Sequence, residues 1–237
     1  MATLNPSPSF PRRFFAGTRT SSKTIEEVAD ASSSVGIRAG WLLRAASVAG
    51  SGEEGARMRV DVLLKAAFLQ PMPSTLALLG DAARDLLGRV PEERSLLNVR
   101  FAKASKALAR KLEGPDGARV GIAFAQLEYE LFEDAESAMA SIDHALDSDA
   151  DLEEYILLLP VAAGLAKSEA ARTAVAKGLA LLDKPFSNVG VPALRFLGAL
   201  ADALGDAAST GRFKMAAAER ESDDDEALVV RACELMG

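Results

Sequence analysis

The chain has 237 residues, enough to bury a substantial core in one large domain or two small ones. Hydrophobic residues make up 49% of it and aromatic residues only 5%, and Ala and Leu dominate the hydrophobic fraction. Because Ala and Leu favour helices while β-branched and aromatic residues favour strands, this composition indicates packed helices and argues against a β-sandwich.

Several kinds of site are excluded or disfavoured by residue counts alone. A single Cys (Cys233) cannot form an internal disulfide, and with a single His (His144) it cannot build a His/Cys metal cage. The longest apolar run, residues 155–166, is interrupted by Pro160 and falls short of the roughly 18–20 residues of a membrane span. The net charge of −7 argues against a general nucleic-acid binder. We therefore expect no cofactor, no metal and no membrane span.

Residues 1–24 are rich in Pro, Ser, Thr and Arg and show no hydrophobic period, which is typical of a disordered tail. The lack of acids also suits an organellar transit peptide, although three prolines oppose the amphipathic helix of such peptides. Arg12 and Arg13 could begin an export signal, but no apolar segment follows them. We expect a cytoplasmic protein, with an organellar location as the alternative if this tail is a targeting peptide.

From about Glu26 onward, apolar residues recur at spacings of three and four, and the breaks contain Gly, Pro, Ser or Asp. This pattern predicts one all-α domain over residues 25–237. Pro160 predicts either a kink or two shorter helices within the segment that contains it. The predicted helices span residues 26–33, 37–49, 53–69, 74–88, 92–112, 116–131, 133–146, 151–167, 169–182, 191–204, 206–219 and 224–236.

Two stretches of the chain repeat one phrase. In the first, small and apolar residues at Ile122 and Ala123 are followed by Phe132-Glu-Asp-Ala135 and then by apolar residues at 139 and 142. In the second, Leu197-Gly198 is followed by Gly205-Asp206 and then by residues 210, 213 and 217. The two phrases are 75 residues apart, or two steps of about 37, and weaker copies occur at 169–176 and 41–56.

This phrase resembles the tetratricopeptide repeat (TPR), in which a helix with a Leu-Gly or Leu-Ala pair precedes a helix that opens with an aromatic–acidic–acidic–Ala sequence. The resemblance covers roughly residues 36–220, with Thr210 where the family has Ala and a period longer than its usual ~34 residues. It implies a right-handed α-α superhelix, or α-solenoid, of about five antiparallel helix pairs. The acidic segment 223–235 is then expected to form a C-terminal capping helix.

In TPR proteins the ligand usually lies in a concave groove lined by the first helix of each pair. Carried over by register, the resemblance implies that the groove contains Val120, Phe124 and Leu127 in one pair, and Arg195, Ala199 and Asp202 in another. The Lys and Asn set with which some members hold a peptide's terminal carboxylate is missing. We therefore expect a non-catalytic scaffold or adaptor that binds a protein partner, and it could be a subunit of a larger complex.

The segment 92–112 also carries a basic strip. Arg100, Lys103, Lys106 and Arg110 follow one another at spacings of 3, 3 and 4, so they share a helix face. Such a strip could bind an acidic peptide, RNA phosphates or an anionic membrane surface, or it could be an ordinary solvated face paired with acids on adjoining helices. Nucleic-acid or anionic-surface binding through this strip is the alternative function.

A helical-bundle enzyme is a further alternative, and it predicts a deep closed pocket that converges on His144 or Glu128. The sequence Gly50-Ser-Gly-Glu-Glu-Gly55 matches a dinucleotide fingerprint in letters, but a helical pattern precedes it and two acids would repel phosphate. Asp147, Asp149 and Asp151 imitate the start of a calcium loop without its later ligands, so we interpret Asp151 as a helix N-cap. No catalytic cluster emerges, and we expect no enzyme activity.

Overall fold

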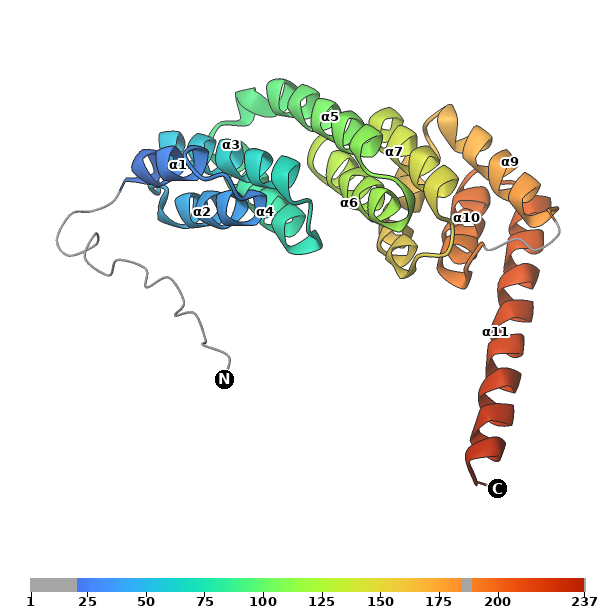
Figure 1. Cartoon of the computed structure of the whole chain (residues 1–237). Helices are drawn as coiled ribbons and strands as arrows, with labels where there is room; N and C mark the ends of the chain where they lie inside the picture. Colours follow the sequence, from blue (N-terminus) through green and yellow to red (C-terminus); the bar gives the residue numbers. More distant parts are fainter. Residues whose placement is uncertain (1–20, 185–188, 237) are drawn as a thin grey trace, which may run out of the picture.

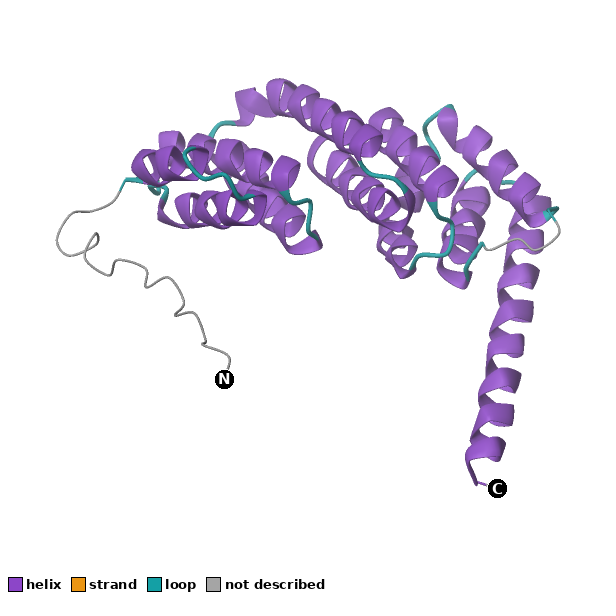
Figure 2. Cartoon of the chain, viewed as in Figure 1, coloured by secondary structure: helices purple, strands orange, loops and turns teal. Residues whose placement is uncertain are grey.

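The computed structural model describes residues 21–184 and 189–236 of the chain, and in these residues every regular element is a helix (Figure 2). The prediction of an all-α fold is thus confirmed. Most of the expected tail, residues 1–20, lies outside the described residues, and its last residues already belong to the first helix, which Ser21 caps by accepting a hydrogen bond from the Thr24 amide. The elements are α1 (Ser22–Asp30), α2 (Val35–Val48), α3 (Glu53–Leu69), α4 (Pro73–Arg89), η1 (Pro91–Glu93), α5 (Arg94–Lys111), α6 (Gly114–Phe132), α7 (Ala135–Ser148), η2 (Glu153–Val161), α8 (Ala162–Leu165), α9 (Ala170–Leu182), α10 (Val191–Ala203) and α11 (Ala207–Met236).

The helices follow one another in chain order along a bent row (Figure 1). Helix α1 packs on α2, α2 on α3 and α3 on α4. Likewise α5 packs on α6, α6 on α7, and α10 on α11. Across the row, α1, α3, α5, α7 and α9 lie on the outer side of the bend, and α2, α4, α6 and α10 lie on the inner side (Figure 1). Contacts between α4 and α6, α6 and η2, and η2 and α10 join the inner elements.

Helix α6 contributes to both of the hydrophobic clusters that form the core. Phe124 and Leu131 belong to the cluster built from α1 to α6, whereas Ile122 and Ala125 belong to the cluster that continues to α11. Because two faces of α6 are buried in opposite directions, this helix joins the two halves of the row. The core is a continuous series of contacts along the row and has no single centre.

The turn from α6 to α7 explains the phrase Phe132-Glu-Asp-Ala135. Helix α6 ends at Phe132, Glu133 takes the left-handed conformation with φ 57°, and Asp134 caps α7 by accepting a hydrogen bond from the Ser137 amide at 3.0 Å. The second phrase has the same turn: Gly205 has φ +75°, and Asp206 accepts a hydrogen bond from the Ser209 amide at 3.1 Å. The phrases are therefore helix–turn–helix junctions, and α7 begins two residues later than predicted.

Three predicted elements differ from the structure. Residues 151–167 form a 3-10 helix, η2, and a short α8, so Pro160 accompanies two short helices, one of the two outcomes expected for it. Leu152, not Asp151, precedes η2 as its N-cap residue, and the N-cap prediction for Asp151 was wrong. The predicted helices 206–219 and 224–236 are one continuous helix, α11, which extends beyond α10 (Figure 1).

Candidate functional site

One candidate site is a hollow of about 750 Å³ on the inner side of the row, between α4, α6 and η2. Val120, Ala123 and Leu127 of α6 line it from one side and Leu76 and Ala77 of α4 from the other. Two of the predicted groove residues, Val120 and Leu127, are thus brought together in one hollow. This hollow is called the inner groove below.

The rim of the inner groove adds exposed apolar side chains. Met72, just before α4, is 48% exposed, and Leu157 of η2 is 45% exposed. Large apolar side chains at this exposure lose water contact when a partner covers them, which favours association. The groove therefore has an apolar floor and an apolar edge.

The charged residues around the inner groove are paired with one another. Arg84 of α4 binds Glu130 of α6 at 2.9 Å, and Arg119 of α6 binds Glu154 of η2 at 2.8 Å. These ion pairs bridge neighbouring inner elements and hold them side by side. Asp81 and Asp116 also bind the two arginines, so the rim contains four acids and two bases and is net acidic.

Phe124 does not line the inner groove, and that prediction was wrong. Its side chain is fully buried and packs edge-on against Phe101 of α5, with ring centroids 6.1 Å apart. Helix α6 is covered on two sides, and its face toward the groove is therefore rotated relative to the predicted one. Ala123, in place of Phe124, lines the groove beside Val120 and Leu127.

The predicted groove residues of α10 do not join the inner groove. Arg195 is exposed and binds Glu221 of α11, and Asp202 is also exposed. Ala199 is half-buried against the second core cluster. The structure therefore places these three residues apart from Val120 and Leu127.

The basic strip of α5 lies on the outer side of the row, between two smaller hollows. Arg100 and Lys103 line one of about 570 Å³, and Lys106 and Arg110 line the other, of about 490 Å³. Arg100 binds Asp61 of α3, as expected for an ordinary paired face. Within the residues whose side chains the structure describes, Lys103, Lys106 and Arg110 are exposed and have no acidic side chain at ion-pair distance.

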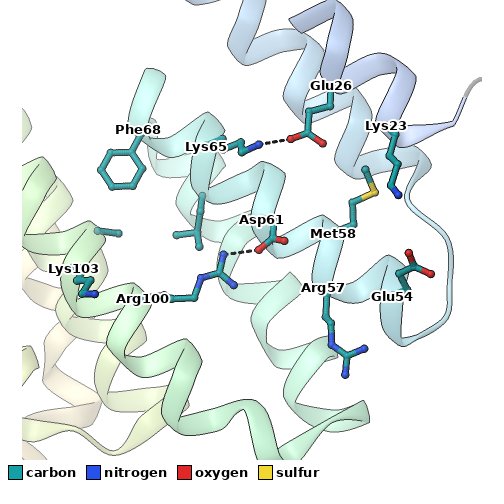
Figure 3. Close-up of a pocket in the computed structure, with 12 residues that line it drawn as sticks. Lys23, Glu26, Glu54, Arg57, Met58, Asp61, Lys65, Phe68, Arg100 and Lys103 are labelled. Carbon is teal, nitrogen blue, oxygen red and sulfur yellow. Dashed lines mark hydrogen bonds and ion pairs between the residues drawn. The ribbon is translucent and has the colours of Figure 1, made fainter. Parts of the chain in front are cut away.

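Figure 3 shows the first of these hollows, between α1, α3 and α5. Lys65 binds Glu26 across α3 and α1, and Arg100 binds Asp61 across α5 and α3. Met58 and Phe68 supply apolar surface, and Phe68 is 38% exposed. The ion pairs join successive outer helices, as the rim pairs join inner ones.

The second hollow lies between α5 and α7, and both Glu128 and His144 line it. Glu128 of α6 is only 1% exposed, and it accepts a hydrogen bond from Ser141, whose hydroxyl is 2.8 Å from that of Ser105. Burial raises the pKa of Glu128 to about 7. The hydrogen bond from Ser141 lowers this pKa, but its effect is smaller than that of burial. This chain of buried polar groups ties α5, α6 and α7 together.

The hollow at Glu128 is not the closed catalytic pocket that the enzyme alternative predicted, because exposed Lys106 and Arg110 form its edge. His144 contacts Ser148 of its own helix at 3.4 Å. The burial of Glu128 could have been inferred from its spacing: it lies four residues after Phe124 and three before Leu131, within the apolar stripe of α6.

The two remaining motifs lie at junctions between helices. Gly50 and Gly52 belong to the turn between α2 and α3, which agrees with the inter-helix reading of that glycine-rich sequence. Asp149 accepts a hydrogen bond from the amide of Asp151 in the turn before η2. Among the described residues, no group of three or more His, Cys, Asp or Glu side chains is arranged to hold a metal ion.

Comparisons with known proteins add no family. No family model matches the sequence, no curated protein matches it significantly, and no solved structure matches the fold significantly. In the described part of the chain, no helix combines the length and the apolar character needed to cross a membrane.

Proposed function

We propose that this protein is a TPR-like helical repeat scaffold, without catalytic activity, that binds a segment of a protein partner in the inner groove. The observation that carries this proposal is the groove itself: an apolar floor from two successive inner helices, edged by exposed Met72 and Leu157. Protein interfaces are centred on apolar pockets of this kind with a polar rim around them.

The spacing of polar contacts between outer helices supports a repeated unit. Arg57 binds Glu93, Asn98 binds Asp134 and Ser105 binds Ser141, and each of these pairs is 36 residues apart. Further along, Lys177 binds Asp143 at a separation of 34 residues. When each repeated unit contacts the next, equivalent contacts recur at a sequence separation equal to the repeat length. The separation of 36 residues is close to the period of about 37 inferred from the sequence.

The two capped turns support the same unit. Asp134 and Asp206 are 72 residues apart, or two steps of 36, and each follows a left-handed residue and binds the amide of a Ser three residues later. Similar turns at a fixed interval are expected when the chain repeats one helix pair. We infer that the row is an α-solenoid built from such pairs, with its inner helices as the binding face.

The chemistry of the inner groove favours a protein segment as its ligand. Its arginines already bind acids of the same chain, so the groove offers apolar burial and an acidic rim in place of reactive groups. The best fit is a segment with one large apolar residue flanked by basic residues, since the apolar side chain fills the floor and the basic ones face the rim.

Affinity capture with matched variants tests this function. Leu157→Glu and Met72→Glu place a charge in the groove, and because both side chains are about half exposed, the fold tolerates them. Met215→Glu is the control, since Met215 is 65% exposed on α11 and lies outside the groove. We expect one dominant partner to be captured by the wild type and by the control, and to be depleted at least about tenfold with either groove variant.

The same capture experiment can contradict the proposal. If all four proteins recover the same set of molecules in the same amounts, the inner groove is not the binding site. If the purified protein alone turns over a metabolite, the non-catalytic assignment is wrong.

The location of the protein is proposed on the sequence alone. We place the scaffold in the cytoplasm, with an organelle as the alternative if residues 1–24 act as a transit peptide. A reporter fused after residue 24 decides between the two by its position in the cell.

A further inference from the structure

The exposed face of α5 is divided into an apolar half and a basic half. Leu96, Val99, Lys103, Lys106 and Arg110 follow one another at spacings of 3, 4, 3 and 4, so they form one stripe along the helix. All five are exposed, and Leu96 and Val99 are 60% and 52% exposed. This set is called the α5 stripe.

Among the described residues, the basic half of the α5 stripe has no acidic partner. Arg100, which lies next to the stripe on α5, binds Asp61. The three basic residues of the stripe have no acid at ion-pair distance among the described side chains. An apolar half and an unpaired basic half on one helix face suit a second helix with an apolar part and an acidic part.

The end of α11, residues 223–236, has that composition in sequence. It begins with Asp223-Asp-Asp-Glu226 and continues to Met236 with mainly apolar residues, interrupted by Arg231 and Glu234. Within the continuous helix, Asp225, Leu228, Ala232 and Leu235 fall on one face by their spacings of 3, 4 and 3, and Arg231 lies beside this face. The order is acidic first and apolar second.

Complementarity then requires an antiparallel arrangement. Along α5 the apolar residues come first and the basic residues last, so a helix running in the opposite direction brings its acids to Lys106 and Arg110 and its apolar residues to Val99 and Leu96. The lengths agree as well: Leu96 to Arg110 is 15 residues, and Asp224 to Met236 is 13. At about 1.5 Å of rise per residue, both stretches are about 20 Å long.

The α11 end cannot reach the stripe of its own chain as a straight helix. Helix α11 begins beside α10 and runs away from the row, with its end far from α5 (Figure 1). We propose that the α11 end of one copy packs antiparallel on the α5 stripe of a second copy, so that the chain associates with itself through these two surfaces. The segment expected to cap its own row packs on the outer side of a neighbouring row instead.

Charge exchange in the full-length protein tests this contact. Lys103→Glu with Lys106→Glu makes the stripe acidic, and Asp224→Lys with Asp225→Lys makes the α11 end basic. Each double variant brings like charges together, so we expect its self-association to weaken by roughly tenfold or more. The two double variants mixed together, or all four changes in one chain, restore opposite charges and should restore association.

The readout is the solution mass over a range of protein concentrations, measured by analytical ultracentrifugation at low and high salt. Lys167→Glu with Lys214→Glu is the matched control, because both lysines are exposed and lie outside the α5 stripe. The control should associate like the wild type, and circular dichroism should show the same helix content in every variant.

Three results would overturn the proposal. The first is a wild type that stays monomeric at every concentration. The second is association that the double variants leave unchanged or that the fourfold variant does not recover. The third is an unchanged mass accompanied by loss of binding to a single-stranded RNA probe, which would assign the stripe to nucleic acid. None of these results bears on the inner groove, which lies on the opposite side of the row.

Discussion

Glu128 is a buried carboxyl whose ionisation is coupled to folding near neutral pH. Its pKa is about 7 in the folded protein, against an ordinary value of 4.5, because burial disfavours the charged form. A raised carboxyl pKa means that the folded state holds the proton more tightly than the unfolded chain does. The contribution of Glu128 to stability is therefore fully present below about pH 4.5 and is lost as the pH rises through 7.

We predict that Glu128→Gln stabilises the protein at pH 8 and does so much less at pH 5. The amide still accepts the hydrogen bond from Ser141 but carries no charge at any pH. The shift from 4.5 to about 7 corresponds to a gain on the order of 3 kcal/mol in the free energy of unfolding at alkaline pH. Urea unfolding of both proteins between pH 5 and 8 measures it.

Glu113→Gln is the control, since Glu113 is an exposed carboxylate before α6. Its unfolding curve should follow the wild type at each pH. Equal pH dependence in the wild type and in Glu128→Gln would show that the buried carboxyl is not the group that titrates.

At the scale of helices, the junction of α6 and α7 depends on a glycine. A Cβ on Gly121 would lie 2.9 Å from the carbonyl oxygen of Ser141 and 3.4 Å from Cβ of Ala145. The nearer of these atoms belongs to the backbone of α7, so the helix itself would have to move. Gly198 differs, because a Cβ there would lie 3.5 Å from Cβ of Phe213, at ordinary van der Waals distance.

We predict that Gly121→Ala destabilises the protein by about 1–2 kcal/mol. Overpacking typically costs about 1–3 kcal/mol, and the better helix propensity of Ala offsets up to about 1 kcal/mol of that. Gly211→Ala is the matched control: it is helical, and a Cβ there meets no atom within 4 Å, so it should stabilise by up to about 1 kcal/mol. Thermal and urea unfolding measure both, and the same sign for the two variants would contradict this account of the junction.

Most helices could be predicted from the sequence because their signals are local. Apolar spacing and capping residues placed α3 and α9 to within a residue, and Pro160 marked the irregular segment. The point where α6 crosses α7 was predicted at Ile122 and Ala123, whereas Gly121 makes the close contact. Which face of a helix meets which neighbour depends on tertiary packing, and a periodic pattern does not contain that information.

The candidate site was likewise predicted only in part from the sequence. Val120 and Leu127 were predicted as groove residues and line the inner groove, but Phe124, on the same predicted stripe, is buried against Phe101. The contributions of Met72 and Leu157 were missed because they come from segments distant in sequence. The sequence predicted two helices in place of the long α11, because the acidic run at 223–226 has the composition of a break between helices.

For the whole molecule, we propose a row of mutually supporting helices whose inner side binds a protein segment. The two core clusters meet at α6, the helix that also forms much of the inner groove. A bound segment therefore contacts the helix on which both halves of the row depend, and it should protect that helix most.

Site-specific photocrosslinking tests this claim most directly. A photoreactive residue at Ala77, which is exposed in the inner groove, should crosslink to one partner segment in native extract. Leu157→Glu in the same chain should abolish the crosslink, and the same photoreactive residue at Ala163, exposed outside the groove, should not capture that segment. Equal capture from Ala77 and Ala163, or a crosslink at Ala77 that survives Leu157→Glu, would contradict the inner groove as the binding site.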